Sequence, residues 1–259
     1  METKTIDPNK EFACLSGHLE SYLYRLTANR EDVKDLLHDT YIEVIRAFPS
    51  FKGLSTFKTW VFSIATNIAR DNQRVKNRWA ADVQDLCKQA AIDNKHYADR
   101  MVAAFQSQTE KRFELAEHIN YCFTCLSKNL SLEKQIAIVL KEMYEFKRSE
   151  IGEIMGISEG VVKHMLFDGR KELQEKYEQR CALINKTGAC YQCSELNNYF
   201  EGAKTSEEKI RQLGLSPENN AEANLDRRFQ LINRINPLTS NGAVTEDVIL
   251  QILRETIKD

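Results

Sequence analysis

The chain has 259 residues, of which 42% are hydrophobic and 29% charged, so it can form two modest domains with separate cores. This composition excludes a wholly disordered or fibrous protein, and a formal net charge of -2 excludes one that simply coats nucleic acid. No apolar run approaches the roughly 20 residues of a membrane span, and METKTIDPNKEF lacks the features of a signal peptide. We therefore expect a cytoplasmic protein that does not insert into a membrane.

Four prolines and ten glycines among many helix formers predict an almost entirely helical chain. Residues 11–28 carry apolar side chains three and four positions apart, and a second apolar stripe runs from Asp32 to Phe48. Pro49 ends that second helix. With the segment that follows, residues 11–78 are predicted to form one compact helical domain.

The stretch FKTWVFSIATNIARDNQRVKNRW, residues 57–79, predicts one helix with a buried face and a basic face. Residues 52–78 hold six basic side chains and one acidic side chain, which suits a nucleic-acid backbone. The aromatic residues at its start can stack on bases that have left the duplex, or can instead belong to the core, and the basic run can be an ordinary solvated face. The candidate nucleic-acid contacts here are Phe57, Trp60, Asn67, Asp71, Arg74 and Arg78.

Three further segments follow along the chain. Residues 79–109 are polar, rich in Ala and Gln and weakly periodic, which predicts a linker that is partly helical or mobile. A second helical domain is expected over residues 110–179. Residues 180–259 form an extension with two amphipathic helices near Leu225–Ile235 and Thr245–Ile257. The predicted fold is all-α, with two helical domains, a linker and a helical C-terminal extension.

RSEIGEIMGISEGVVKHMLFDGRKEL has the pattern of a helix-turn-helix. Gly152 is small enough for a close helix contact, Gly156 sits at the turn, and Ser158 can cap the second helix. That second helix would lie in the major groove of DNA, although a generic pair of packed helices is the alternative. Its outward-facing candidates for contacts to bases and phosphates are Glu159, Lys163, His164, Phe167, Arg170 and Lys171.

Two stretches, DVKDLLHDTYIEVIRAFPSFKGLSTFKTWVFSIATNIARDNQRVKNR and LSLEKQIAIVLKEMYEFKRSEIGEIMGISEGVVKHMLFDGRKEL, resemble the two conserved domains of bacterial RNA polymerase sigma factors. The resemblance is to the small two-domain group called extracytoplasmic function, or ECF, and covers about residues 11–178. It implies that the first domain grips a coiled coil of the polymerase and reads the melted minus-ten element. The second would read the minus-thirty-five element.

The resemblance also implies roles for individual residues. The loop Phe51–Phe57 would receive a flipped base, and Asn67, Asp71, Arg74 and Arg78 would follow the DNA. GVVKHMLFDGRKEL stands where these factors often have GTVKSRLSRARRRL, so promoter specificity does not transfer, and a minimal ECF factor lacks the extension. The row that would face core polymerase, or would be a solvated helix face, is Asp35, His38, Asp39, Glu43 and Arg46.

The cysteines form two CxxC pairs, Cys122 with Cys125 and Cys190 with Cys193. Two such pairs are the half-sites of a tetrahedral structural zinc centre, which would clip the extension to the second domain. The same pairs can instead act as a redox sensor, or Cys122 and Cys125 can be small core residues. His18, His96 and His118 have no ligand-like spacing and are interpreted as ordinary polar residues.

The sequence thus predicts a sigma factor, not an enzyme, whose partners are core RNA polymerase and promoter DNA, with an anti-sigma factor left open. The extension would tune its activity, either clipped through cysteines or packed through its two helices. A stand-alone helix-turn-helix regulator that senses metal or redox state is the rival hypothesis, and a structural helical adaptor is the third.

Overall fold

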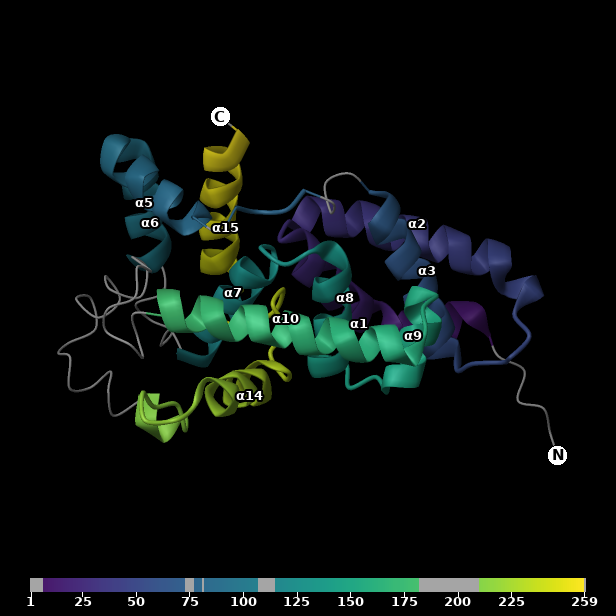
Figure 1. The fold of residues 1–259 in the computed structure, drawn as a ribbon. Coiled ribbons are helices and arrows are strands. Elements are labelled where there is room, and N and C mark those ends of the chain that lie inside the picture. The colour runs from purple at the N-terminus through teal and green to yellow at the C-terminus, as the bar shows by residue number, and fades with distance from the viewer. Residues whose placement is uncertain (1–6, 73–76, 81, 107–114, 182–209, 259) are drawn as a thin grey trace. The chain divides into compact units, whose positions relative to one another are not determined.

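The computed structural model describes residues 7–72, 77–80, 82–106, 115–181 and 210–258, and the regular elements in these ranges are all helical (Figure 1). The all-α prediction is therefore confirmed. Each helix in the described ranges is too short or too polar to cross a lipid bilayer. The chain divides into a first compact unit, Met1–Asn77 with Leu132–Leu166, and a second, Arg78–Ser131 with Phe167–Asp259.

The predicted helix-turn-helix domain, 110–179, contributes helices to both units, and the boundary between the units falls inside one helix, α10 (Glu159–Arg180). This division follows packing alone. The domain boundaries drawn from the sequence on functional grounds therefore stay a prediction.

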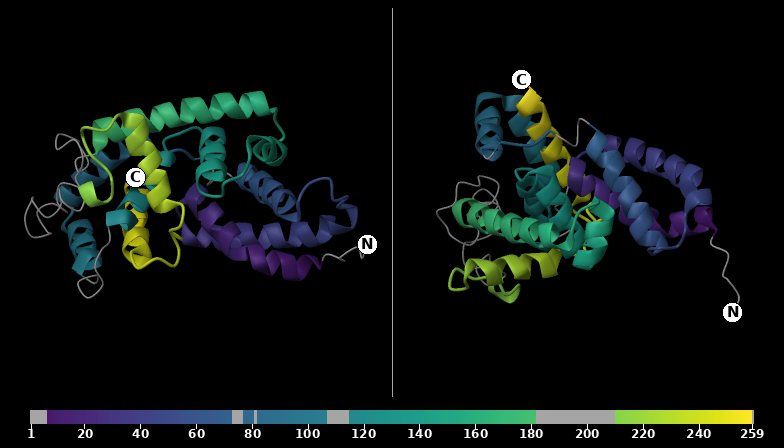
Figure 2. Two further views of the ribbon diagram at one scale, coloured as in Figure 1. Left: turned by 90° about the horizontal axis from the view of Figure 1, so that it is seen from below. Right: turned by 45° about the vertical axis from the view of Figure 1, so that its right-hand side comes forward.

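Helices α1 (Pro8–Thr27), α2 (Arg30–Ala47) and α3 (Phe57–Asp71) pack against one another in the first unit (Figure 2). Each begins at a polar cap whose side chain accepts a hydrogen bond from the first helical turn. These caps are Asp7, Asn29 and Thr56. Two further helices, α8 (Leu132–Glu142) and α9 (Arg148–Met155), pack on α1 and α3 respectively.

An aromatic core joins these helices. The ring of Phe62 on α3 lies 5.2 Å from Tyr22 of α1, 5.4 Å from Tyr144 and 5.0 Å from Phe146, measured between centroids. Edge-on and tilted rings at such distances are favourable aromatic pairs. The segment that leads into the helix-turn-helix is therefore fixed to the first three helices by a shared core.

In the second unit, α15 (Ala243–Lys258) lies alongside α5 (Val83–Asp93) and α6 (Lys95–Gln106) and also contacts α7 (Leu115–Ser127) (Figure 1). The segment predicted as a linker thus contains two helices. The other extension helix, α14 (Ala221–Ile232), packs on α7.

Specific contacts secure both extension helices. Phe229 of α14 meets Phe123 of α7 edge-on at 5.8 Å, and Arg100 of α6 donates to Glu255 of α15 at 2.7 Å. The prediction of two helices packed on the body therefore agrees with the contacts inside this unit.

His118 on α7 differs from the ordinary polar residue expected there. It is buried, whereas the other four histidines are exposed. Burial disfavours the charged imidazolium and lowers the pKa of His118 to about 4. This histidine is therefore part of the core of the second unit.

Candidate nucleic-acid interface

Four aromatic side chains gather where the chain turns from α2 into α3, and we call them the aromatic corner: Phe48, Phe51, Phe57 and Trp60. The ring centroids of Phe51 and Trp60 lie 4.8 Å apart, and those of Phe57 and Trp60 lie 5.7 Å apart. Phe57 is buried, as the core interpretation expected, while Trp60 is half-buried. Trp60 therefore packs in the corner and keeps part of its ring accessible.

The corner anchors both ends of a short exposed loop. Gly53 has a positive φ of 67°, and Thr56 caps α3 by accepting a hydrogen bond from the Thr59 N–H at 3.1 Å. At the tip, Leu54 is 91% exposed. An apolar side chain so exposed on an anchored loop is a binding candidate that periodicity did not reveal, because it lies outside any helix.

The basic helix is shorter than predicted. Helix α3 ends at Asp71, and Asn72 caps it in an extended conformation, so α3 spans 15 residues or about 22 Å. Asn67 and Asp71 are exposed as expected, whereas Arg74 lies outside the described residues.

Arg78 is not part of this helix. It lies in a non-helical segment of the second unit, half-buried, and burial lowers the pKa of its guanidinium to about 10. The predicted continuous row from Trp60 to Arg78 on one helix is therefore wrong. Between Ala69 and Arg78 the sequence offers only Val75 to anchor another helical turn, and Asn72 follows Asp71 and caps the helix.

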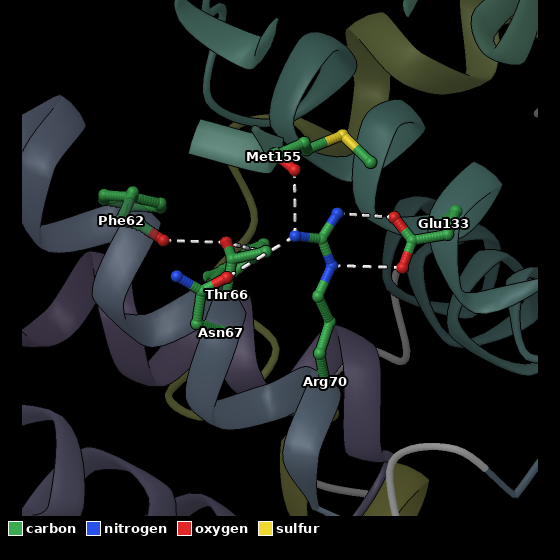
Figure 3. Close-up of polar contacts among 7 residues, drawn as sticks. Phe62, Thr66, Asn67, Arg70, Glu133 and Met155 are labelled. Atoms are coloured by element: carbon green, nitrogen blue, oxygen red, sulfur yellow. Dashed lines mark hydrogen bonds and ion pairs between the residues drawn. The ribbon is translucent and has the colours of Figure 1, made fainter. Parts of the chain in front are cut away.

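Arg70, on the same basic face of α3, donates to four acceptor atoms within the first unit, one of them the side-chain oxygen of Asn67 at 3.4 Å (Figure 3). Its guanidinium donates to both carboxylate oxygens of Glu133, at 3.0 and 2.5 Å, and to the backbone carbonyl of Met155 at 3.0 Å. Glu133 lies in the first turn of α8 and Met155 is the last residue of α9. A cation on the predicted DNA path is therefore engaged by the segment that leads into the helix-turn-helix.

The outer face of α2 carries the row predicted for polymerase. Asp35, His38, Asp39 and Arg46 are exposed, and the half-buried Glu43 pairs with Arg46 at 2.6 Å. The sequence reasoning missed Ile42, which is 50% exposed beside this row. The face therefore combines charges with an apolar centre, a composition common at protein interfaces.

The helix-turn-helix turn has the predicted geometry. Gly156 caps α9 with a φ of 68°, and a Cβ at Gly152 would lie only 2.8 Å from the carbonyl oxygen of Ile157. Ser158 accepts a hydrogen bond from the Val161 N–H at 3.4 Å at the start of α10. The close contact, the turn and the cap are therefore all present.

Most predicted contact residues on α10 are accessible. Phe167 is 68% exposed, while Glu159 forms an ion pair with Arg148 of α9 at 3.4 Å. Lys163, His164 and Lys171 are exposed as well. This exposure suits a reading face, and the DNA contacts themselves stay a prediction.

Arg170 differs from the rest of this face because the extension engages it. Its guanidinium forms an ion pair with Asp226 of α14 and lies 5.4 Å from the ring centroid of Phe229. The Arg170 side chain is 22% exposed and that of Asp226 is 50% exposed. A carboxylate of the extension thus occupies a side chain predicted to reach DNA phosphates.

Of the four predicted zinc ligands, two lie among the described residues. Cys122 is half-buried and Cys125 buried on α7, and Cys190 and Cys193 lie outside the described residues. Burial, followed by the nearby thiol of Cys122, raises the pKa of Tyr177. The described residues contain no cluster of three metal-ligating side chains, so the zinc centre stays a prediction.

Comparisons with known proteins find two family matches, one in each of the two domains predicted from the sequence. The family described as Sigma-70 region 2 matches residues 12–79, and that described as Sigma-70, region 4 matches residues 122–173. Both matches end before the extension. They cover the aromatic corner, the outer face of α2 and the helix-turn-helix.

Curated relatives agree with these matches. An ECF RNA polymerase sigma-E factor of Haemophilus influenzae is 26% identical over 150 residues, covering 58% of this chain and 77% of the relative. RNA polymerase sigma factor YlaC of Bacillus subtilis is 28% identical over 157 residues, covering 60% and 83%. A solved structure of the sigma factor RpoE in complex with the anti-sigma factor NepR from Bartonella quintana is 18% identical, covers 66% of this chain and 96% of its own, and has a TM-score of 0.44.

Proposed function

We propose that this chain, which belongs to the ECF group of RNA polymerase sigma factors and so directs transcription initiation, binds core polymerase through α2 and melted promoter DNA through the aromatic corner. The observation that carries the proposal is the anchored loop with Leu54 at its tip and the half-buried Trp60 at its base. Aromatic and apolar groups held in this way can accept a base that has left the duplex. The covalent chemistry would remain in the core enzyme.

The polymerase contact is assigned to the outer face of α2. Ile42 provides an apolar centre, and Asp35, Asp39 and Arg46 provide charges around it. Apolar anchors within a charged rim commonly dominate the binding energy of an interface. An anti-sigma factor that covered this face would block the same contact.

Both DNA-binding regions hold an arginine in an intramolecular ion pair. Arg70 is engaged by Glu133, and Arg170 by Asp226. We infer that the chain rests in a restrained state, which promoter complexes relieve. The extension would act on transcription by holding Arg170, and it needs no cysteine clip for this because α14 and α15 attach by packing.

The zinc clip is a separate proposal. Cys122 and Cys125 would supply one half-site on α7, and Cys190 and Cys193 the other, to a structural ion. Zinc content of the purified protein tests it: stoichiometric zinc that is lost in both Cys122→Ser and Cys190→Ser supports the clip. Protein that folds and functions without zinc contradicts it.

Transcription with core polymerase tests the main proposal against a stand-alone regulator. The chain should comigrate with core polymerase and support initiation from promoters selected out of a randomised DNA library. Binding to duplex DNA that needs no polymerase, without initiation, would favour the regulator. Absence of both activities would favour the structural adaptor.

A pair of matched variants assigns the polymerase face. Ile42→Glu should weaken core binding at least about tenfold, because it places a charge in the apolar centre. Val244→Glu, at a side chain 69% exposed on α15, makes the same kind of change away from that face and should leave core binding unchanged. Equal core binding by both variants would show that α2 is not the contact.

A further inference from the structure

The second unit contains a small polar pocket that the proposed function does not use. Its volume is about 170 Å³, and it opens between the C-terminal part of α10 and the start of α14. The side chains that line it include Gln174, Tyr177, Glu178, Asn219, Asn224 and Arg228.

Arg228 is the unusual member of this lining. Only 4% of its surface is exposed, and its guanidinium lies 4.1 Å from the ring centroid of Tyr177. Across the described ranges, Arg228 makes neither a hydrogen bond nor an ion pair. Because arginine stays charged, a buried guanidinium without an anion is costly, and a single aromatic contact offsets only part of that cost.

Of the other polar groups in the lining, the buried Tyr177 hydroxyl makes no hydrogen bond with the described residues, and Glu178 is an exposed carboxylate. The amide of Asn224 is used at both ends, donating to the Ser216 carbonyl at 2.8 Å and accepting from the Ser216 N–H at 3.2 Å. The pocket also touches Ala221, the first residue of the 12-residue helix α14, where the helix dipole favours an anion.

We infer that this pocket binds a small anion that carries a carboxylate or a phosphate group and pairs with Arg228. Its volume suits such a ligand, since each water molecule occupies about 30 Å³ in the liquid. Bidentate hydrogen bonding to either group matches the planar guanidinium. Glu178 contributes a carboxylate to the lining, but no ion pair joins Arg228 to it or to another described carboxylate.

The position of the pocket gives the anion a regulatory effect. One wall belongs to α10 and the other to α14, so a bound anion stabilises the docked extension by mass action. Asp226, which holds Arg170, lies two residues before Arg228 on the same helix. Resting on the proposed function, we expect the anion to strengthen the hold on Arg170 and to lower affinity for promoter DNA.

Titration calorimetry of the full chain with inorganic phosphate, and separately with acetate, tests the site without polymerase or DNA. Ionic strength is held constant with chloride. Arg228→Met should lose at least about tenfold in affinity, because it removes a charge-assisted contact. Arg234→Met removes an exposed arginine just beyond α14 and should bind as the natural chain does.

The two anions distinguish the sources of the ligand. Tighter binding of phosphate points to a phosphate compound, and tighter binding of acetate points to a carboxylate compound. The inference is overturned if neither binds with a Kd below about 10 mM, or if Arg228→Met binds both as tightly as Arg234→Met.

A second variant keeps the test decisive if Arg228→Met folds poorly. Glu178 is an exposed carboxylate in the lining, so Glu178→Gln removes charge that repels an anion without disturbing the core. It should raise affinity about two- to threefold at low salt. Unchanged or weaker binding would refute the assignment.

Discussion

Arg70 and Arg170 are both held by carboxylates from elsewhere in the chain, but in different ways. Arg70 presents a bidentate fork to Glu133 and a third hydrogen bond to the Met155 carbonyl. Arg170 has an ion pair with the half-exposed Asp226 and an aromatic ring beside it. Glu133 therefore accepts two hydrogen bonds from Arg70, whereas Asp226 accepts a single charged hydrogen bond from Arg170.

This difference implies different ways of release. A DNA phosphate can replace the carboxylate of Asp226, because both are anions that accept from a guanidinium. A phosphate that replaced Glu133 at Arg70 would leave the Met155 carbonyl in place as a competing acceptor, unless α9 moved. We therefore expect DNA to compete directly at Arg170, while Arg70 needs a rearrangement such as polymerase binding would supply.

Removal of the extension should have the largest effect on stability. Because it also removes Asp226, it leaves no Arg170 contact to compare with that of Arg70. Ending the chain at residue 180 removes, among others, the seven large buried apolar side chains of α14 and α15, which contribute at least about 10 kcal/mol. That equals the whole stability of many domains. Thermal unfolding should show loss of the second unit's transition, and an unchanged transition would contradict the packing described. The side chains removed are Leu225, Phe229, Ile232, Ile249, Leu250, Ile252 and Leu253.

Acid should lower the free energy of unfolding of the second unit, which contains Arg170. The cause is the buried His118. Above pH 6.5 the imidazole is neutral in both folded and unfolded chains, so it adds no pH dependence. As the pH falls from 6.5 to about 4, only the unfolded chain takes up the proton, which costs the fold about 3 kcal/mol. Unfolding free energies measured against pH should be flatter in His118→Gln, and identical slopes would contradict this.

The Arg70–Glu133 interaction should give a coupling energy of about 1–2 kcal/mol in a double-mutant cycle built from Arg70→Met and Glu133→Gln. Its partial exposure, 22% and 40% for the two side chains, keeps the value below that of a buried pair. The Lys95–Asp99 pair on α6, 87% and 62% exposed, is the control and should couple more weakly than Arg70–Glu133. Equal coupling energies in both cycles would show that the Arg70–Glu133 interaction is no stronger than an ordinary surface ion pair.

The smallest effect on stability belongs to Asp226, but it has a clear signature in DNA binding. Asp226→Asn should change unfolding by less than about 1 kcal/mol. Without the Asp226 carboxylate, Arg170 can neutralise one more phosphate, so the slope of log affinity against log salt should steepen by about 0.9.

Glu222→Gln is the matched control, since it removes the same charge from an exposed position on α14. Its salt slope should equal that of the natural chain. If both variants steepen the slope equally, the effect is one of net charge, and the specific contact with Arg170 is refuted.

Local patterns predicted much of this structure. The apolar spacing located α1 and α2, and the residue types at Gly152, Gly156 and Ser158 specified the turn between α9 and α10. These features depend on neighbours within a few positions of the chain. The predicted extension helices also formed, although α14 begins at Ala221, earlier than expected.

Features that depend on distant partners were not predictable in the same way. Arg70 meets Glu133 across 63 positions, and Arg170 meets Asp226 across 56. The sequence placed Arg70 within the basic run of residues 52–78 and Arg170 among the outward-facing candidates, but it did not identify their partners. The resemblance assigned the loop Phe51–Phe57 to a flipped base, but Leu54 was not named because loops carry no period. The end of α3 was misplaced because Val75 is the one apolar residue between Ala69 and Arg78.

The packing at Gly152 has a consequence for tolerance of sequence change. Its missing side chain leaves room for the Ile157 carbonyl, and its own carbonyl accepts from the Ile157 N–H at 2.9 Å, so neither partner can shift without opening the turn. In a saturation library selected for folded protein, all nineteen substitutions at this codon should be depleted. The adjacent Glu153 is exposed and should accept most substitutions. Two neighbouring codons would therefore differ sharply in the number of substitutions that they tolerate.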